Sequence, residues 1–306
     1  MEQIYDVLII GGGPAGYTAA LYAARAGLDA LVLERRGPGG QMALTHWIDN
    51  YPGFPEGVEG FELGQRMEAG AARFGVRTVQ AEVTAVRLDG KVKEVSTGEG
   101  TFRGRTVILA TGAEPRKLGI SGGAEATGHG ISYCAACDGM FYRGKTVAVA
   151  GGGNSAAADA LLLSRVAKKV IVIHRRDTLR AEKASAAQLM AAENVEFLWN
   201  SAVEGLLDGE KFRGVRVREV TTGKETEVVC DGLFVCIGRT PATALFAGQV
   251  LLDDRGYLTA DESTRTDVAG VFAAGDVRTK AVRQIVTAVA DGAAAAHAAA
   301  EYLHEK

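Results

Sequence analysis

The sequence contains no long apolar run and no large excess of charge. Its net charge is −3 over 306 residues, so its composition gives no reason to expect nucleic acid or an anionic membrane surface as a partner. The first apolar stretch, Val7–Ile10, ends after a few residues at a run of glycines, and no signal-peptide pattern precedes it. We therefore expect neither a cleaved targeting segment nor a membrane span.

Cysteine is also scarce. The chain has 4 cysteines, and this small number, without a secretory signal, predicts a cytoplasmic protein in a reducing environment. In that environment, two cysteines close together in the sequence are more often catalytic than structural. Cys134 and Cys137 form such a pair, with two residues between them.

Glycine, by contrast, is abundant, with 40 residues, and many of them lie in two phosphate-loop patterns. The segment Gly11–Gly16 follows the apolar run 7–10, and Gly151–Ala156 follows a second apolar run, 147–150. A glycine loop at the start of a helix directs backbone N–H groups and the positive end of the helix dipole at a pyrophosphate. The loop residues expected to bind nucleotide are Gly11, Gly13 and Gly16 in the first loop and Gly151, Gly153, Ser155 and Ala156 in the second.

Each glycine loop begins a similar pattern. A helix candidate follows, at 15–25 and at 156–166, and then a short apolar strand candidate. These strands end at Glu34 and at His174, each 23 residues after the first glycine of its loop. The equal spacing predicts two βαβ units of one design.

The remaining segments indicate how the domains connect. Strand candidates at 106–110 and 232–236 close the two units, and a last strand and helix, 270–276 and 285–303, carry no third glycine fingerprint. These last elements most simply complete the first domain. We therefore predict an α/β protein with two Rossmann-like nucleotide-binding domains, the second inserted into the first. The expected boundaries are 1–114 plus 242–306 for the first domain and 115–241 for the inserted one, with crossings near Pro115 and Pro241.

The residue that ends the second strand of each unit predicts its nucleotide. Glu34 can accept hydrogen bonds from adenosine ribose hydroxyls, which suits FAD or NAD and repels a 2′-phosphate. The inserted unit has a basic cluster instead, and guanidinium groups bind a 2′-phosphate through paired hydrogen bonds. We therefore expect NADPH there, and the alternative is a solvated basic helix start without a ligand. The cluster consists of His174, Arg175, Arg176 and Arg180.

Asp276 follows the last strand candidate, where a carboxylate can hold a ribityl hydroxyl of FAD. Arg283 and Gln284 are then expected near the start of the last helix. Backbone donors there stabilise the negative charge that a reduced flavin carries at its N1–C2=O edge. The alternative for Asp276 is an ordinary helix N-cap, and the two roles are compatible.

Three interpretations compete for Cys134 and Cys137. They form a redox-active disulfide, a zinc site with two further ligands, or a pair of buried, unreactive thiols. Cys230 and Cys236 lie six positions apart on a strand pattern, and we expect both to be buried packing residues on the same face. The two flanking nucleotide loops favour the redox disulfide. Asp138 is a candidate general acid for a leaving thiolate, or simply the first residue of an Asp-Gly turn.

The motifs occur in one order and spacing, at 11–16, 39–41, 50–53, 110–112, 134–139, 151–156, 174–177 with 180–181, and 275–276 with 283–284. Together they resemble the low-molecular-weight thioredoxin reductases of the bacterial type, from end to end of the chain. The resemblance implies a homodimeric flavoprotein that uses FAD and NADPH to reduce thioredoxin. It also implies that Cys137 faces the flavin, that Cys134 attacks the partner disulfide, and that Gln41 and Asn50 contact FAD.

Several positions depart from the commonest pattern of that family. Ala136 stands where threonine is frequent, Arg239 stands where histidine often follows Ile-Gly, and His46-Trp47 is unusual in a segment that is generally more polar. None of them is expected to touch the redox chemistry.

Other functions are disfavoured by particular features. A flavin dithiol oxidase or a ferredoxin-driven reductase does not need the arginine cluster, and the intact loop Gly151–Ala156 further disfavours the second. A glutathione-reductase-type enzyme places its cysteines near the first flavin loop, whereas residues 38–50 contain none. A flavin-binding redox sensor, which is not an enzyme, has no use for the dithiol, the acid and the NADPH site together.

Overall fold

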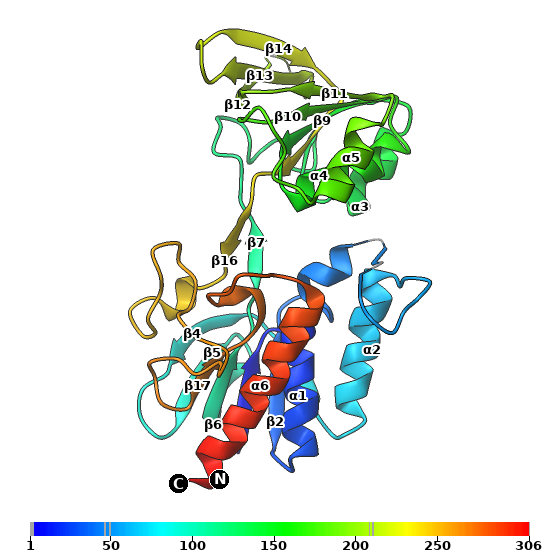
Figure 1. Ribbon diagram of the computed structural model, residues 1–306. Coiled ribbons are helices and arrows are strands. Elements are labelled where there is room, and N and C mark those ends of the chain that lie inside the picture. The colour runs from blue at the N-terminus through cyan, green and yellow to red at the C-terminus, as the bar shows by residue number, and fades with distance from the viewer. Residues whose placement is uncertain (1–2, 46, 49, 208, 210, 306) are drawn as a thin grey trace. The chain divides into compact units, whose positions relative to one another are not determined.

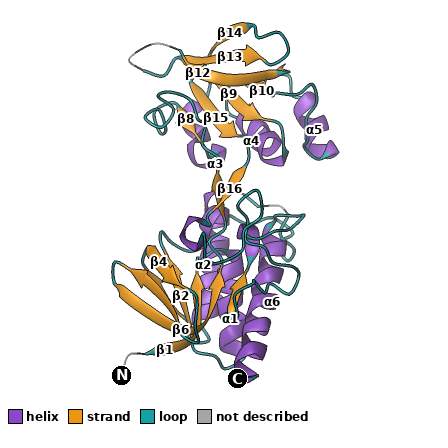
Figure 2. Cartoon of the chain, turned by 90° about the vertical axis from the view of Figure 1, so that its left-hand side faces the viewer, coloured by secondary structure: helices purple, strands orange, loops and turns teal. Residues whose placement is uncertain are grey.

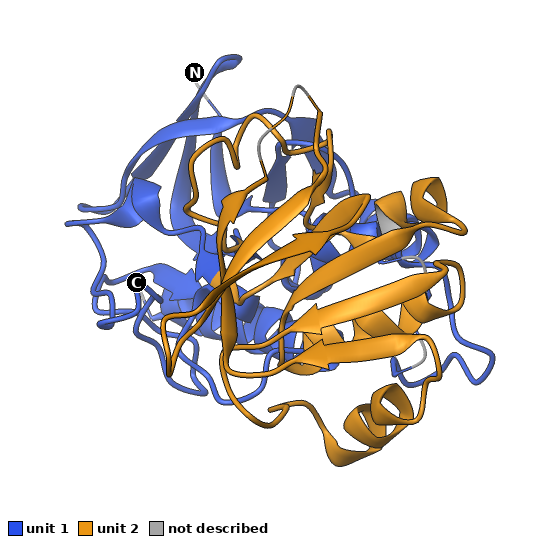
Figure 3. Ribbon diagram, turned by 90° about the horizontal axis from the view of Figure 1, so that it is seen from above, with its two compact units in different colours: residues 1–114, 240–306 blue, residues 115–239 orange. Residues whose placement is uncertain are grey.

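The computed structural model describes residues 3–305 except 46, 49, 208 and 210, and of Ala136 and Cys137 it describes only the backbone. The chain divides into two compact units, coloured separately in Figure 3. Unit 1 comprises residues 1–114 and 240–306, and unit 2 comprises 115–239. Within the described residues, no helix is both long enough and apolar enough to cross a membrane.

Unit 1 is built on a sheet that runs in the order β3-β2-β1-β6-β5-β4, with β17 paired to β6 (Figure 1). The pairs β1–β2, β2–β3, β1–β6 and β6–β17 are parallel, and β4–β5 and β5–β6 are antiparallel. The strands are β1 (Ile4–Ile10), β2 (Ala30–Glu34), β3 (Arg77–Gln80), β4 (Val83–Arg87), β5 (Lys93–Thr97), β6 (Gly100–Leu109) and β17 (Val271–Ala273). The helices are α1 (Pro14–Arg25), α2 (Gly60–Ala72) and α6 (Ile285–His304), with the 3-10 turns η1 (Gly40–Leu44), η3 (Ala244–Phe246) and η4 (Gly275–Val277).

The alternation of side chains along β1 explains the layers of unit 1. Val7 and Ile9 face one core together with residues of α1 and α6, whereas Leu8 and Ile10 face a second core together with Phe246. Because both faces of the strand are covered, the strand is an unbroken apolar run. Helices α1, α2 and α6 lie side by side on the first face (Figure 1).

Unit 2 repeats this plan with a parallel sheet in the order β11-β10-β9-β15-β8. A three-stranded antiparallel sheet, β12-β13-β14, covers the face opposite α4 and α5 (Figure 2). The strands of unit 2 are β8 (Ile131–Ser132), β9 (Thr146–Gly151), β10 (Lys169–Ile173), β11 (Val195–Leu198), β12 (Ser201–Leu206), β13 (Gly214–Glu219), β14 (Glu225–Val229) and β15 (Gly232–Cys236). Its helices are α3 (Ala135–Asp138), α4 (Asn154–Ser164) and α5 (Lys183–Met190), with the 3-10 turn η2 (Gly139–Tyr142).

The two chain segments that connect the units pair with each other. Strands β7 (Ala113–Pro115) and β16 (Arg239–Pro241) form a separate two-stranded sheet. Arg116 N donates to Gly238 O on the side of unit 2, and Ala242 N donates to Gly112 O on the side of unit 1. The two connecting segments are therefore hydrogen-bonded to each other and do not form separate linkers.

The expectation for the remaining cysteines is partly wrong. Cys230 precedes strand β15, whereas Cys236 ends it, so the two are not on one strand. Cys230 is buried against the face covered by β13, and Cys236, which is half-buried, packs on the face covered by α4. Both are packing residues, but on opposite faces of the sheet.

Candidate nucleotide and dithiol sites

The first glycine loop joins β1 to α1, and its glycines serve different purposes. A Cβ on Gly16 would lie 1.8 Å from Gly11 O, so this position allows no side chain. A Cβ on Gly13 would meet nothing within 4 Å, and the backbone there is extended with φ −79°. No side chain caps the first turn of α1 at Gly13. Gly16 is thus required for packing, and Gly13 leaves open space in front of the helix N-terminus.

Glu34 ends β2 beside this loop. Its Oε2 accepts a hydrogen bond of 2.6 Å from Gly12 N, and its Oε1 accepts one of 2.8 Å from Arg36 N. Gly39 N donates to Gly12 O at 2.8 Å, which brings the turn that precedes Gln41 against the same loop. The predicted residues of the first loop, Glu34 and the start of η1 therefore belong to one site in unit 1.

The distant segment 275–284 completes the site. A Cβ on Gly275 would lie 3.0 Å from Cβ of Ala15, so the turn that carries Asp276 packs on the start of α1. Asn50 Nδ2 donates to Gln284 Oε1 at 3.1 Å, which joins two predicted FAD contacts that are 234 positions apart. Gln284 is the N-cap of α6 in a capping box with Thr287. The N-cap alternative for Asp276 is therefore wrong for this helix, because Asp276 lies in the earlier turn η4.

Arg283 lies close to the same helix start. Its guanidinium stacks over the ring of Tyr257, 3.9 Å from the centroid, and one terminal nitrogen donates to Arg278 O at 3.2 Å. Its buried Nε has no hydrogen-bond partner among the described residues. A buried N–H without a partner is rare, and it marks a position where a bound group can accept a hydrogen bond.

The second glycine loop, between β9 and α4, has the same division of roles. A Cβ on Gly153 would meet nothing within 4 Å, and no side chain caps α4 there. Ala156 is buried at the position where the first loop has Gly16, and Ser155 is exposed. Gly151 has a φ of +148°, which favours glycine.

The basic cluster follows β10 at the same edge. The His174 ring, 3% exposed, lies against Gly152, where an added Cβ would be 2.4 Å from the ring. Burial and the charges of Arg180, Arg176 and Arg175 lower the pKa of His174, and they outweigh a hydrogen bond to the Thr178 backbone that raises it. His174 is therefore neutral at pH 7, and its buried Nε2 has no hydrogen-bond partner among the described residues.

The arginines lie on a loop before α5, so the helix start in the alternative interpretation is wrong. Arg180 N donates to Gly152 O at 2.7 Å, and Glu182 N donates to Asn154 Oδ1 at 2.8 Å. These hydrogen bonds hold the segment against the glycine loop, and α5 begins only at Lys183. Arg175 and Arg176 are exposed beside His174, where a phosphate group can reach them.

The dithiol segment follows β8. Cys134 is disulfide-bonded, whereas Cys230 and Cys236 are free; the Cys137 side chain lies outside the described residues. Ser132, which the sequence analysis did not select, organises this segment. Its hydroxyl donates to Asp138 Oδ2 at 2.6 Å and accepts from Cys134 N at 3.1 Å. The only sequence signal for Ser132 is its place two residues before a reactive cysteine.

The geometry bears on the zinc interpretation of Cys134 and on the packing role of Cys236. The Cys134 sulfur is bonded to another sulfur, so it is not a zinc ligand here, and the described residues contain no group of three His, Cys, Asp or Glu suited to a metal. Cys236 Sγ donates to Asp159 Oδ2 at 3.0 Å. Burial raises the pKa of both Cys236 and Asp159, which makes Cys236 a poor nucleophile.

Comparisons with known proteins agree with this arrangement. The family model described as pyridine nucleotide-disulphide oxidoreductase matches residues 5–292. A thioredoxin reductase of Listeria monocytogenes is 46% identical over 99% of this chain and 95% of its own length. Crystal structures of the thioredoxin reductases of Lactococcus lactis and T. acidophilum superpose with TM-scores of 0.95 and 0.90, at 41% and 35% identity. They cover 99% and 98% of this chain, and 100% and 99% of their own chains are matched. The chain therefore belongs to the thioredoxin reductase family of pyridine nucleotide-disulphide oxidoreductases.

Proposed function

We propose that this chain is a thioredoxin-disulfide reductase that passes electrons from NADPH through FAD and the Cys134/Cys137 dithiol to oxidised thioredoxin. The observation that carries the proposal is the dithiol segment of unit 2. There Cys134 is disulfide-bonded, and Ser132 holds the carboxylate of Asp138 next to it. The same unit contains the arginine-edged glycine loop, and a glutamate-edged loop lies in unit 1.

The residues of unit 1 fit FAD. Gly13 leaves space for a pyrophosphate at the N-terminus of α1, Glu34 offers a carboxylate for ribose, and Arg283 offers a buried N–H. Gln41, Asn50, Asp276 and Gln284 complete the predicted contacts. A bound FAD would supply the two-electron chemistry that links hydride transfer from NADPH to reduction of a disulfide.

The residues of unit 2 fit NADPH. Gly151, Gly153, Ser155 and Ala156 surround the uncapped start of α4. The exposed guanidiniums of Arg175 and Arg176 are placed to bind a 2′-phosphate, and neutral His174 adds no charge of its own. Arg180 is tied through its backbone to Gly152, so loop and cluster act as one binding site.

The dithiol then performs thiol–disulfide exchange. The Cys134 thiolate attacks a sulfur of the thioredoxin disulfide, forming a mixed disulfide and releasing a thiolate that takes a proton from Asp138. The Cys137 thiolate next attacks Cys134, which restores the Cys134–Cys137 disulfide and frees the second thiol. The sum is NADPH plus a proton plus disulfide, giving NADP⁺ plus dithiol.

An apolar surface beside the dithiol supports a protein as the acceptor. Met140 and Phe141, directly after the redox segment, are 56% and 74% exposed. Large apolar side chains that remain exposed next to a reactive group are typical of protein interaction sites. A small dithiol substrate has no use for them.

Two variants, Cys134→Ser and Cys137→Ser, test the electron order. Each is expected to abolish thioredoxin reduction, while NADPH still bleaches the flavin absorbance, since the dithiol acts after the flavin. Cys230→Ala, a change of a buried thiol outside the site, is the matched control and keeps both reactions. Loss of flavin bleaching in both folded serine variants contradicts the proposed order.

Assembly and location are part of the same proposal. We infer a homodimer in the cytoplasm, because the family resemblance implies a dimer and because the cysteine content suits a reducing compartment. Light scattering of the purified protein tests the first point, and a molar mass near that of one 32.0 kDa chain contradicts it. Cell fractionation tests the second.

A further inference from the structure

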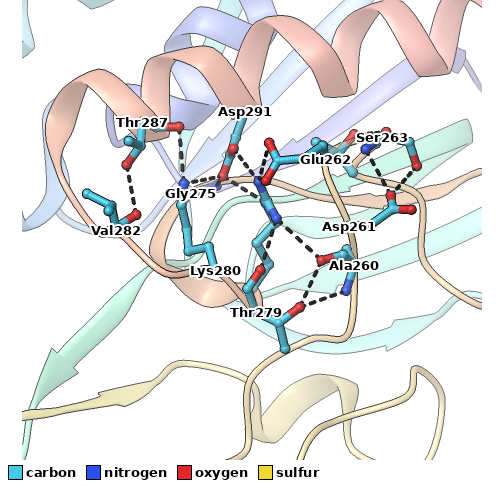
Figure 4. A network of polar contacts seen from close by, with 12 residues as sticks. Ala260, Asp261, Glu262, Ser263, Gly275, Thr279, Lys280, Val282, Thr287 and Asp291 are labelled. Carbon is cyan, nitrogen blue, oxygen red and sulfur yellow. Dashed lines mark hydrogen bonds and ion pairs between the residues drawn. The ribbon is translucent and has the colours of Figure 1, made fainter.

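A cluster of buried charges joins the segment 275–284 to helix α6 (Figure 4). Asp291, on α6, accepts hydrogen bonds from Arg278 Nε at 2.9 Å and from a terminal nitrogen of Arg278 at 2.7 Å. Lys280 Nζ donates to Asp291 Oδ2, the oxygen that also accepts from Arg278 Nε, at 2.7 Å. The side chains of Arg278, Lys280 and Asp291 are 2%, 6% and 6% exposed. Two cations and one anion are therefore enclosed together.

Filling a core with charged side chains is energetically unfavourable. Removing three charges from water carries a large desolvation penalty, and apolar side chains of similar volume usually stabilise a fold as well or better. Burial by itself raises the pKa of Asp291, but the hydrogen bonds from Arg278 and Lys280 outweigh it and lower that pKa. The carboxylate is thus held charged, and its hydrogen bonds fix neighbouring groups in place.

Asp291 Oδ2 also accepts a hydrogen bond of 2.8 Å from Gly275 N, the residue before Asp276. Arg278 O accepts from the guanidinium of Arg283 at 3.2 Å. The cluster therefore holds one end of the segment directly and the other through Arg278. Asp276 and Arg283, two of the predicted flavin contacts, lie at those ends.

Lys280 ties the same segment to the helix. Its Nζ donates to Thr287 O at 3.1 Å, within the first turn of α6. Thr287 in turn closes the capping box with Gln284. The start of α6, the turn η4 and the loop between them consequently share one buried carboxylate.

We propose that Asp291, with Arg278 and Lys280, is a positioning residue of the FAD site, setting Asp276 and Arg283 in the arrangement that binds the flavin. The inference rests on the proposed function only through FAD. Asp291 acts without contacting the cofactor, by fixing the backbone of the segment that carries Asp276 and Arg283.

The test separates positioning from stability by removing the whole cluster at once. In the full-length apoprotein, Asp291→Leu with Arg278→Met and Lys280→Met replaces three charges by apolar groups, a change expected to preserve folding. We expect its dissociation constant for FAD, measured by quenching of flavin fluorescence, to rise at least about tenfold. Asp291→Asn alone is expected to weaken FAD to a similar extent, and the milder Lys280→Met about threefold.

Glu301→Gln is the matched control. Glu301 lies on the same helix and forms a 2.8 Å ion pair with Arg265, but that pair is half-exposed and touches none of the predicted flavin contacts. Its FAD affinity should stay within twofold of wild type, and NADP⁺ binding should be unchanged in every variant. Wild-type FAD affinity in the folded triple variant, or in Lys280→Met should the others not fold, overturns the inference. A wild-type protein that binds no FAD refutes the proposed function instead.

Discussion

The two βαβ units share a backbone design and differ in charge at the end of their second strand. In unit 1 the second strand ends at Glu34, whose carboxylate accepts a hydrogen bond from the middle glycine of its loop. In unit 2 the strand ends at Ile173 and His174 follows it, with its ring packed on the corresponding glycine and exposed arginines beside it. The loop geometry accordingly suits any pyrophosphate, and the residue at the strand end selects the rest of the nucleotide.

The largest effects are expected from Gly13→Val and Gly153→Val, made separately. Both glycines have extended backbones, and a Cβ at either one meets no protein atom within 4 Å. The new side chain instead occupies the space in front of a helix N-terminus, where a phosphate binds. We expect Gly13→Val to fold but to lose FAD at least about a hundredfold, giving a colourless protein. Gly153→Val should keep its yellow colour and lose reduction by NADPH.

Gly16→Val is the informative companion to these two variants. There the added carbon collides with Gly11 O, so folding itself should fail, as circular dichroism can show. A yellow Gly13→Val protein, or a Gly153→Val protein that NADPH still reduces at the wild-type rate, contradicts the claim that both loops bind a pyrophosphate in the same way.

A smaller effect is expected when the basic edge of unit 2 is removed. Arg175→Ala with Arg176→Ala deletes charged hydrogen bonds, and a single one is worth about 1.5–3 kcal/mol, or roughly ten- to hundredfold in affinity. NADPH binding should weaken by at least about tenfold and NADH binding hardly at all, because NADH lacks the 2′-phosphate. Arg218→Ala, an exposed arginine on β13, serves as the control. Equal losses for NADPH and NADH in steady-state kinetics contradict the assignment.

The fold class was predictable because its signals are local. Glycine spacing, apolar runs such as Val7–Ile10 and the strand Gly232–Cys236 are properties of short segments, and the structure confirms the two parallel βαβ units that they predict. The basic segment after His174 was harder to interpret. Its charge favoured a helix start as the alternative, but hydrogen bonds to Gly152 and Asn154 hold it as a loop.

The residues that the sequence analysis missed depend on side-chain contacts that exist only in the folded chain. Ser132 becomes important because its hydroxyl contacts both Cys134 N and Asp138 Oδ2, and Asp291 lies in an alanine-rich helix that looks like simple packing. Tyr257 supports Arg283 from a loop that carries no motif. No periodicity or spacing encodes such contacts, whereas glycine loops are encoded by the residues that form them.

The smallest expected effect concerns pH and again contrasts the two strand ends. The pKa of His174 is lowered in the folded protein, mainly by burial, so the folded state binds fewer protons than the unfolded state in mild acid. The corresponding stability is present above the unfolded value near 6.5 and is lost as the pH falls through the folded pKa. Urea unfolding between pH 7 and pH 5 should therefore show a falling free energy whose slope becomes shallower in His174→Gln, by less than about one proton. Trp199 stands edge-on to the His174 ring, so its fluorescence reports on this unit once the other tryptophan is removed by Trp47→Phe. An unchanged slope in His174→Gln means that His174 binds protons equally in the folded and unfolded states, which contradicts a pKa lowered by burial.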